Sequence, residues 1–180
     1  QIFLDRLADK GIFTVSRWYN PDNLGETGRV VSLAVTALLE SGIPEPSRHI
    51  AMLTTASVST LLLSKQPFTQ QDITTLRQVA SDLQYDLAIL PGTPPIHKAL
   101  RDIVSARSPE ELERAITNEF LNYTPPTDEN PYFFNMLRLK YIIPVFFSKL
   151  GEADGVIRGK LHATLTLSGL IVCLVLLTMV

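Results

Sequence analysis

Short apolar runs and longer amphipathic stretches follow one another along the chain. The short runs are rich in β-branched residues and bounded by turn residues, and they predict strands at residues 12–16, 49–54 and 58–64. The longer stretches have helical spacing and predict helices at residues 2–9 and 25–41, after Thr69 and after Ser108. The sequence therefore predicts an α/β domain.

Two of the predicted strands, residues 49–54 and 58–64, are separated by very few residues. A connection that short cannot cross over a sheet, so these strands are expected to be antiparallel neighbours. The next helix has a capping-box start, with Thr69 as N-cap and Asp72 three residues later. Five apolar residues then share one predicted helix face: Ile73, Leu76, Val79, Ala80 and Leu83.

The last twenty residues differ from the rest of the chain. From Leu161 to Val180 the only ionisable side chains are those of His162 and Cys173. Twenty helical residues span roughly 30 Å, which matches the hydrocarbon core of a bilayer. The segment is therefore expected to be a transmembrane helix, with a buried core helix as the alternative. Basic residues precede it and favour a cytoplasmic side: Arg138, Lys140, Lys149, Arg158 and Lys160.

Composition excludes several classes of function. The net charge of −2 comes from 16 basic and 18 acidic residues without a run of one sign, so nucleic-acid binding is not expected. The single cysteine, Cys173, allows no disulfide framework. The histidines have no ligand spacing, so no metal site is expected. The chain contains neither GxGxxG nor GxSxG.

Both ends of the chain suggest a piece of a larger protein. Gln1 already lies inside a predicted helix, and Val180 ends the apolar segment without a polar flank. We therefore expect sequence upstream and further membrane helices downstream.

Three segments carry a resemblance to a known family. They are Gly11–Trp18, Ser59–Thr69 and Pro125–Asn135. Their amino-acid sequences resemble those of bacterial polytopic membrane proteins with a spermidine-synthase-like domain. This domain is of the S-adenosylmethionine-dependent methyltransferase type.

The resemblance implies a division into three parts. Residues 1–122 would be the second half of a Rossmann-like methyltransferase-type sheet ending in an antiparallel strand pair. Residues 123–160 would form a proline-rich and aromatic membrane-proximal segment, and residues 161–180 the transmembrane helix. The implied partners are the lipid bilayer and the remaining membrane helices of the same protein. The implied location is the bacterial inner membrane, with the domain facing the cytoplasm.

The resemblance also implies a cofactor, S-adenosylmethionine or its decarboxylated form. Its Gly-rich loop and ribose-binding acidic residue would lie upstream of Gln1. The domain is then expected to be a transferase of methyl or aminopropyl groups. The alternatives are a non-catalytic ligand-sensing or scaffold domain of a transporter-like membrane protein, or a soluble part that mediates assembly.

Arg17, Trp18 and Tyr19 are the candidate cofactor-binding residues. They follow a predicted strand, and ligands of open α/β sheets bind beyond the carboxyl ends of the strands. Arginine can pair with a carboxylate, and the aromatic rings can stack on a base. The alternative is that the rings pack the rim of the domain while Arg17 is solvated.

Asp128 and Glu129 are the candidate catalytic residues. They lie in a proline-rich loop and could act as a carboxylate pair toward an amine, oriented by Asn135. The alternative is an ordinary solvated turn that leads into Phe133 and Phe134.

Overall fold

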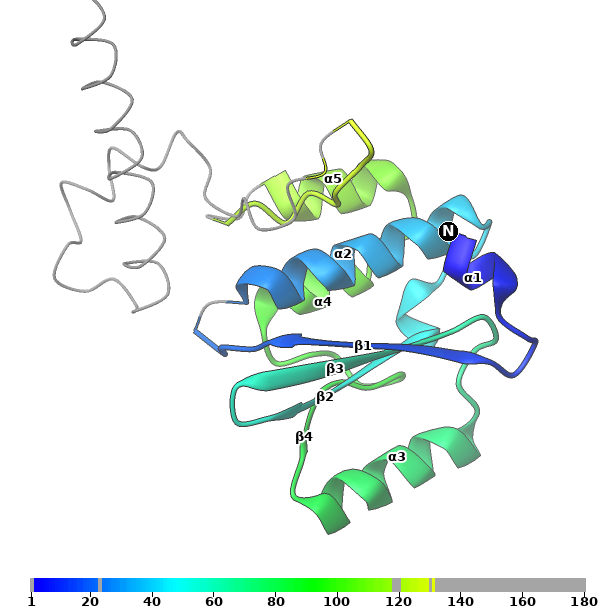
Figure 1. The fold of residues 1–180 in the computed structure, drawn as a ribbon, viewed down its shortest axis with the longest axis vertical. Helices are drawn as coiled ribbons and strands as arrows, with labels where there is room; N and C mark the ends of the chain where they lie inside the picture. The colour runs from blue at the N-terminus through cyan, green and yellow to red at the C-terminus, as the bar shows by residue number, and fades with distance from the viewer. Residues whose placement is uncertain (1, 23, 118–120, 130, 132–180) are drawn as a thin grey trace, which may run out of the picture. The chain divides into compact units, whose positions relative to one another are not determined.

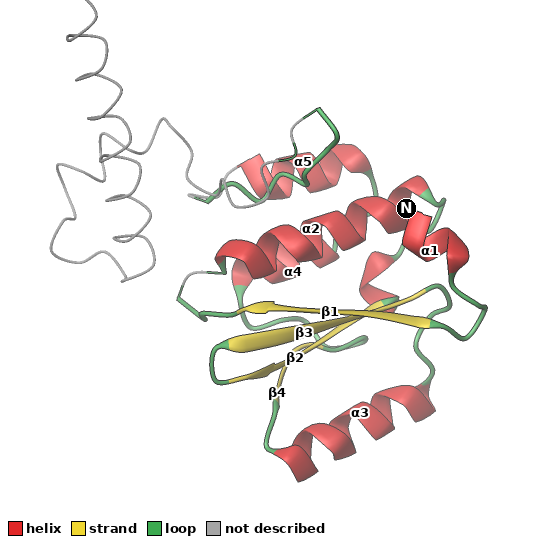
Figure 2. Cartoon of the chain, viewed as in Figure 1, coloured by secondary structure: helices red, strands yellow, loops and turns green. Residues whose placement is uncertain are grey.

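Four strands form one sheet in the computed structural model, which describes residues 2–22, 24–117, 121–129 and 131 (Figure 1). The strands are β1 (Ile12–Trp18), β2 (Ile50–Thr55), β3 (Val58–Ser64) and β4 (Asp86–Ile89). The helices are α1 (Ile2–Arg6), α2 (Gly25–Glu40), the 3-10 helix η1 (Pro46–Arg48), α3 (Gln70–Leu83), α4 (Lys98–Val104) and α5 (Pro109–Thr117). The predicted α/β class is confirmed (Figure 2).

The sheet is antiparallel throughout, in the order β1-β3-β2-β4. The predicted antiparallel pairing of β2 with β3 is confirmed, and a two-residue turn, Ala56-Ser57, joins them. β3 then pairs with β1 from Ser64 against Ile12 to Val58 against Trp18. β1 and β2 therefore run in the same direction with β3 between them, and β1 lies at one edge of the sheet.

The helices α2, α4 and α5 lie on one side of the sheet, together with the short α1, and α3 lies on the other (Figure 1). The larger core forms between the sheet and α2. Side chains alternate along a strand, so one face of the sheet carries the buried residues Ile50, Met52, Leu61 and Leu63. From the helix side, α2 contributes fully buried residues such as Val31, Val35 and Leu38. This layer fixes α2 along the sheet.

α3 begins as the sequence predicts. The Thr69 hydroxyl accepts from the Asp72 backbone N–H at 3.2 Å, and the Thr69 N–H donates to the Asp72 carboxylate at 2.8 Å, which completes the capping box. The expected apolar face is only partly correct, because Val79 and Leu83 are 40% and 55% exposed. The helix packs through a narrower line that includes Ile73 and Leu76, in a cluster with Ala51, Phe68 and Leu90.

Residues 121–129 run along α2 as an extended segment beside α5 (Figure 1). Tyr123 is 3% exposed and lies against Gly28, and Arg29 donates to the Thr124 carbonyl oxygen at 2.7 Å. The chain divides into two units, Gln1–Met136 and Leu137–Val180, and all described residues belong to the first.

The expected transmembrane protein needs a correction. Across the described residues no helix combines the length and the apolar character that crossing a bilayer requires. The segment Leu161–Val180, on which the expectation rested, lies outside the described residues. For the part of the chain that the structure describes, the expectation of a membrane-spanning protein is therefore wrong.

Candidate functional site

A groove of about 450 Å³ lies at the carboxyl end of β1. Three elements meet there: the end of β1, the first turn of α2, which follows β1 after a short loop, and the start of β3, which is distant in sequence. The lining residues are Ser16, Arg17, Trp18, Glu26 and Val58. Two of the three candidate cofactor-binding residues, Arg17 and Trp18, thus line one groove.

Buried hydroxyl groups fix the backbone beneath this groove. The Thr27 hydroxyl donates to the Trp18 carbonyl oxygen at 2.9 Å and lies 2.9 Å from the Ser59 hydroxyl. The Ser59 hydroxyl also donates to the Arg17 carbonyl oxygen at 3.4 Å. Thr27 and Ser59 are 1% and 3% exposed, so their bonds are shielded from water and hold the last residues of β1 against α2.

The side chains of the groove combine an aromatic surface with a carboxylate. Trp18 is 70% exposed, and Val58 stands opposite it in the strand register. One guanidinium N–H of Arg17 donates to the Ser16 carbonyl oxygen at 2.9 Å. Glu26 supplies the negative charge. Such a surface suits a ligand with a planar ring and a cationic group.

Tyr19 takes a different role from its two neighbours. Its backbone N–H donates to the Ser57 carbonyl oxygen at 2.8 Å, and its side chain is not among those that line the groove. Burial, followed by the negative charge of Asp86, raises the pKa of the Tyr19 phenol above 10.0. Tyr19 therefore remains a neutral phenol and supports the turn between β2 and β3.

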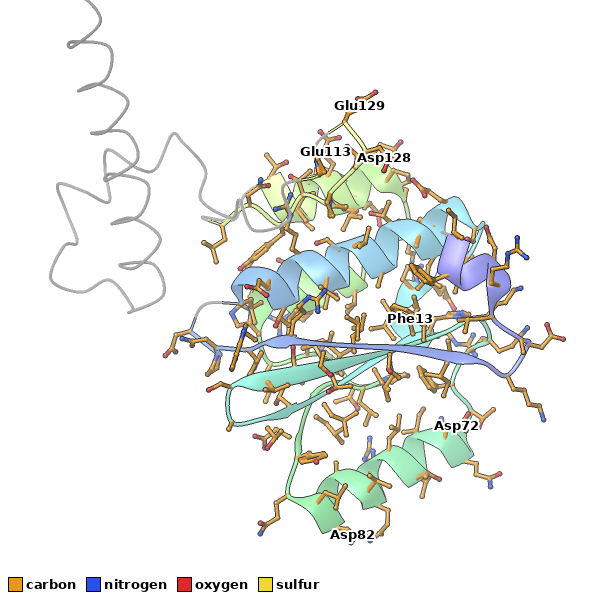
Figure 3. All side chains as sticks on the ribbon, viewed as in Figure 1. Phe13, Asp72, Asp82, Glu113, Asp128 and Glu129 are labelled. Carbon is orange, nitrogen blue, oxygen red and sulfur yellow. The ribbon has the colours of Figure 1, made fainter. Side chains whose placement is uncertain are left out.

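The candidate acids lie elsewhere. Asp128 and Glu129 are exposed near Glu113 of α5 (Figure 3). The neighbouring Thr127 lines a separate cavity of about 260 Å³ with Glu40, at the carboxyl end of α2. The groove contains Glu26, at the opposite end of a helix of 16 residues, which is about 24 Å long. The structure therefore does not bring the acids to the groove, and Asn135 lies outside the described residues.

Sequence reasoning missed Glu26 and Val58. Glu26 carries a usable signal, since it stands in the first turn of a helix that directly follows a strand, where open α/β sheets bind ligands. Val58 carries none, because its place depends on the pairing of β3 with β1.

No group of three or more metal-ligating side chains occurs within the described ranges. Comparison of the chain with protein-family models, with curated proteins and with solved structures finds no match. The groove at the end of β1 is thus the feature on which a functional proposal rests.

Proposed function

We propose that this domain binds S-adenosylmethionine or its decarboxylated form and acts as a transferase of methyl or aminopropyl groups. The observation that carries the proposal is the groove at the carboxyl end of β1, which joins Trp18 to Glu26. In mostly parallel α/β sheets, ligands bind beyond the carboxyl end of a strand, next to the start of the following helix, and β1 with α2 has this local arrangement.

The strand order supports a Rossmann-like, methyltransferase-type origin of the sheet. β1, α2 and β2 form a unit in which the two strands run the same way, and β3 returns between them. This is the order expected for the second half of such a sheet. Among the described residues β1 pairs only with β3, which leaves its other edge open to a further strand.

The chemistry of the groove fits the proposed ligands. An adenine ring can stack on Trp18, and stacking of a base on an aromatic side chain contributes about 1–3 kcal/mol. The sulfonium is a cation and pairs favourably with the Glu26 carboxylate. In the transfer step the carbon–sulfur bond breaks, its electron pair stays on sulfur, and the carbon forms a bond to the acceptor.

The ligand can be tested directly because Trp18 is the only tryptophan of the chain. We expect S-adenosylmethionine or its decarboxylated form to change Trp18 fluorescence and to release heat in calorimetry of the full chain. Glu26→Gln should weaken binding by about tenfold, since one charge-assisted contact contributes about 1.5 kcal/mol. Glu40→Gln, at the other end of the same helix, is the matched control and should bind normally. No fluorescence change and no heat at millimolar ligand would refute the proposal.

The second candidate function is a non-catalytic ligand-sensing or scaffold domain. The open edge of β1 favours it, because the exposed side chains of Ile12 and Trp18 lie along this strand and suit an assembly surface. Product analysis separates the two candidates: binding without release of the thioether that has lost its methyl or aminopropyl group would favour the sensing domain.

A further inference from the structure

We infer that residues 121–129, which we call the strap, are coupled to the groove through the first turn of α2. When the strap is docked, this turn holds the end of β1 in the geometry described above. When the strap is displaced, the turn shifts and the wall formed by Trp18 moves. The consequence for ligand affinity rests on the proposed function, whereas the coupling itself does not.

The groove side of the coupling consists of two neighbouring residues of α2. Glu26 lines the groove, and Thr27 donates to the Trp18 carbonyl oxygen at 2.9 Å. The bond from Thr27 is a direct mechanical link between the helix and the groove wall, and it lies in a water-excluded position beside Ser59.

The strap side consists of the next two residues. A Cβ placed on Gly28 would lie 2.6 Å from a ring carbon of Tyr123, so only glycine leaves room for this ring. The Arg29 Nε–H donates to the Thr124 carbonyl oxygen at 2.7 Å. Tyr123 and Arg29 are 3% and 1% exposed, so the strap covers this part of α2 closely.

These four residues, 26–29, form little more than one helical turn, and a packed helical turn moves as a unit. A displacement of the strap removes both the ring that covers Gly28 and an acceptor of the buried Arg29. The turn must then readjust, because a buried guanidinium without all its acceptors is unfavourable. Thr27 lies between these contacts and the groove, so its bond to Trp18 transmits the readjustment.

The strap can be displaced by one methyl group, and Trp18 reports the result in the absence of ligand. We expect Gly28→Ala to shift Trp18 emission, to change its quenching by acrylamide, and to increase protease cleavage within residues 121–129. Leu33→Ala is the control, because Leu33 is a partly exposed residue of the same helix and lines neither the groove nor the cavity beside the strap. Circular dichroism verifies that each variant is folded.

Two further variants make the test specific. Tyr123→Ala removes the ring that the new methyl group would meet, so Gly28→Ala combined with Tyr123→Ala should show the same Trp18 quenching as Tyr123→Ala alone. Thr27→Val removes the hydroxyl link with little change of shape, so adding Gly28→Ala to it should no longer alter Trp18. If Gly28→Ala does not fold, Tyr123→Ala alone displaces the strap without a clash and must alter Trp18.

A strap that becomes protease-sensitive while Trp18 emission and quenching stay unchanged would overturn the coupling. Ligand titrations give a separate answer: in Gly28→Ala, affinity for S-adenosylmethionine should change about fivefold or more, as is typical of coupled sites. If no variant binds the ligand but Trp18 still reports the strap, the proposed function fails and the coupling stands.

Discussion

Ala56 adopts a backbone conformation that suits glycine. Its φ is +46°, and it is the first residue of the two-residue turn between β2 and β3. A left-handed conformation costs an L-residue with a Cβ roughly 1–2 kcal/mol, and glycine avoids this cost. Part of the stabilisation from a glycine is offset, because glycine loses more conformational entropy on folding. We expect Ala56→Gly to raise the free energy of unfolding by about 0.5–1 kcal/mol in urea titrations.

Ser57 provides the matched control for this prediction, since it lies in the same turn without a positive φ. Ser57→Gly should lower the free energy of unfolding slightly, because glycine relieves no backbone strain at this position and makes the unfolded chain more flexible. Equal effects of the two substitutions would contradict the explanation.

His49 predicts a pH dependence of stability. It is 6% exposed, and its Nδ1 lies 3.1 Å from the Ser64 carbonyl oxygen. Burial lowers the pKa of His49 below its ordinary value of 6.5, although the Ser64 carbonyl favours the charged ring. Between the two pKa values, the unfolded chain therefore binds a proton at His49 and the folded chain does not. The contribution of neutral, buried His49 to the free energy of unfolding is fully present above pH 6.5 and is lost as the pH falls from 6.5 toward the lower pKa of the folded chain.

Urea titrations at about pH 7.5 and about pH 5.5 measure this contribution. We expect His49→Asn, which keeps a side-chain donor but does not titrate, to lose much of the stability difference between the two values. The carboxyls of Asp72 and Glu110 do not interfere, because their pKa values are lowered and their contributions fade only as the pH falls below 3.8 and 4.5. An unchanged difference in His49→Asn would exclude His49 as its source.

At the scale of elements, the capping box makes α3 the clearest case of local control. The Thr69 side chain supplies an acceptor to the first turn of a helix that packs alone on its side of the sheet among the described elements. Thr69→Ala should destabilise the domain by about 1 kcal/mol in thermal or urea unfolding. Thr74→Ala is the control, since Thr74 is exposed within the same helix, and its effect should stay within about 0.5 kcal/mol.

What the sequence predicts correctly at this scale depends on neighbours along the chain. The short connection after Thr55 determines the antiparallel pairing of β2 with β3, and Thr69 with Asp72 determines the start of α3. The exposure of Val79 and Leu83 escapes such reasoning, because helical spacing shows which residues share a face and not how much of that face another layer covers. The pairing of β1 with β3 escapes it because the two strands are distant in sequence, with α2 and β2 between them.

At the scale of the whole molecule, the candidate site could be predicted only in part. Arg17 and Trp18 follow the predicted strand 12–16 and are the last two residues of the observed β1, so the strand pattern alone is enough to find them. Glu26 could be found from its place in the first turn of the helix that follows this strand, whereas Val58 joins the groove only once the sheet order is known. The position of Asp128 depends on the path of the strap along α2, which no local pattern in the sequence indicates.

This path yields a prediction about the acids. Asp128 and Glu129 are the last two residues of the strap, which reaches the carboxyl end of α2, about 24 Å along the helix from the groove. Water and salt screen charges at such a distance. The double variant Asp128→Asn with Glu129→Gln should therefore bind S-adenosylmethionine within about twofold of the unchanged chain, whereas Glu26→Gln binds about tenfold more weakly. Calorimetry at physiological salt measures both. An equal loss in the double variant would mean that the acids act on the ligand after all, and that the groove beside Trp18 is not where the ligand's cation binds.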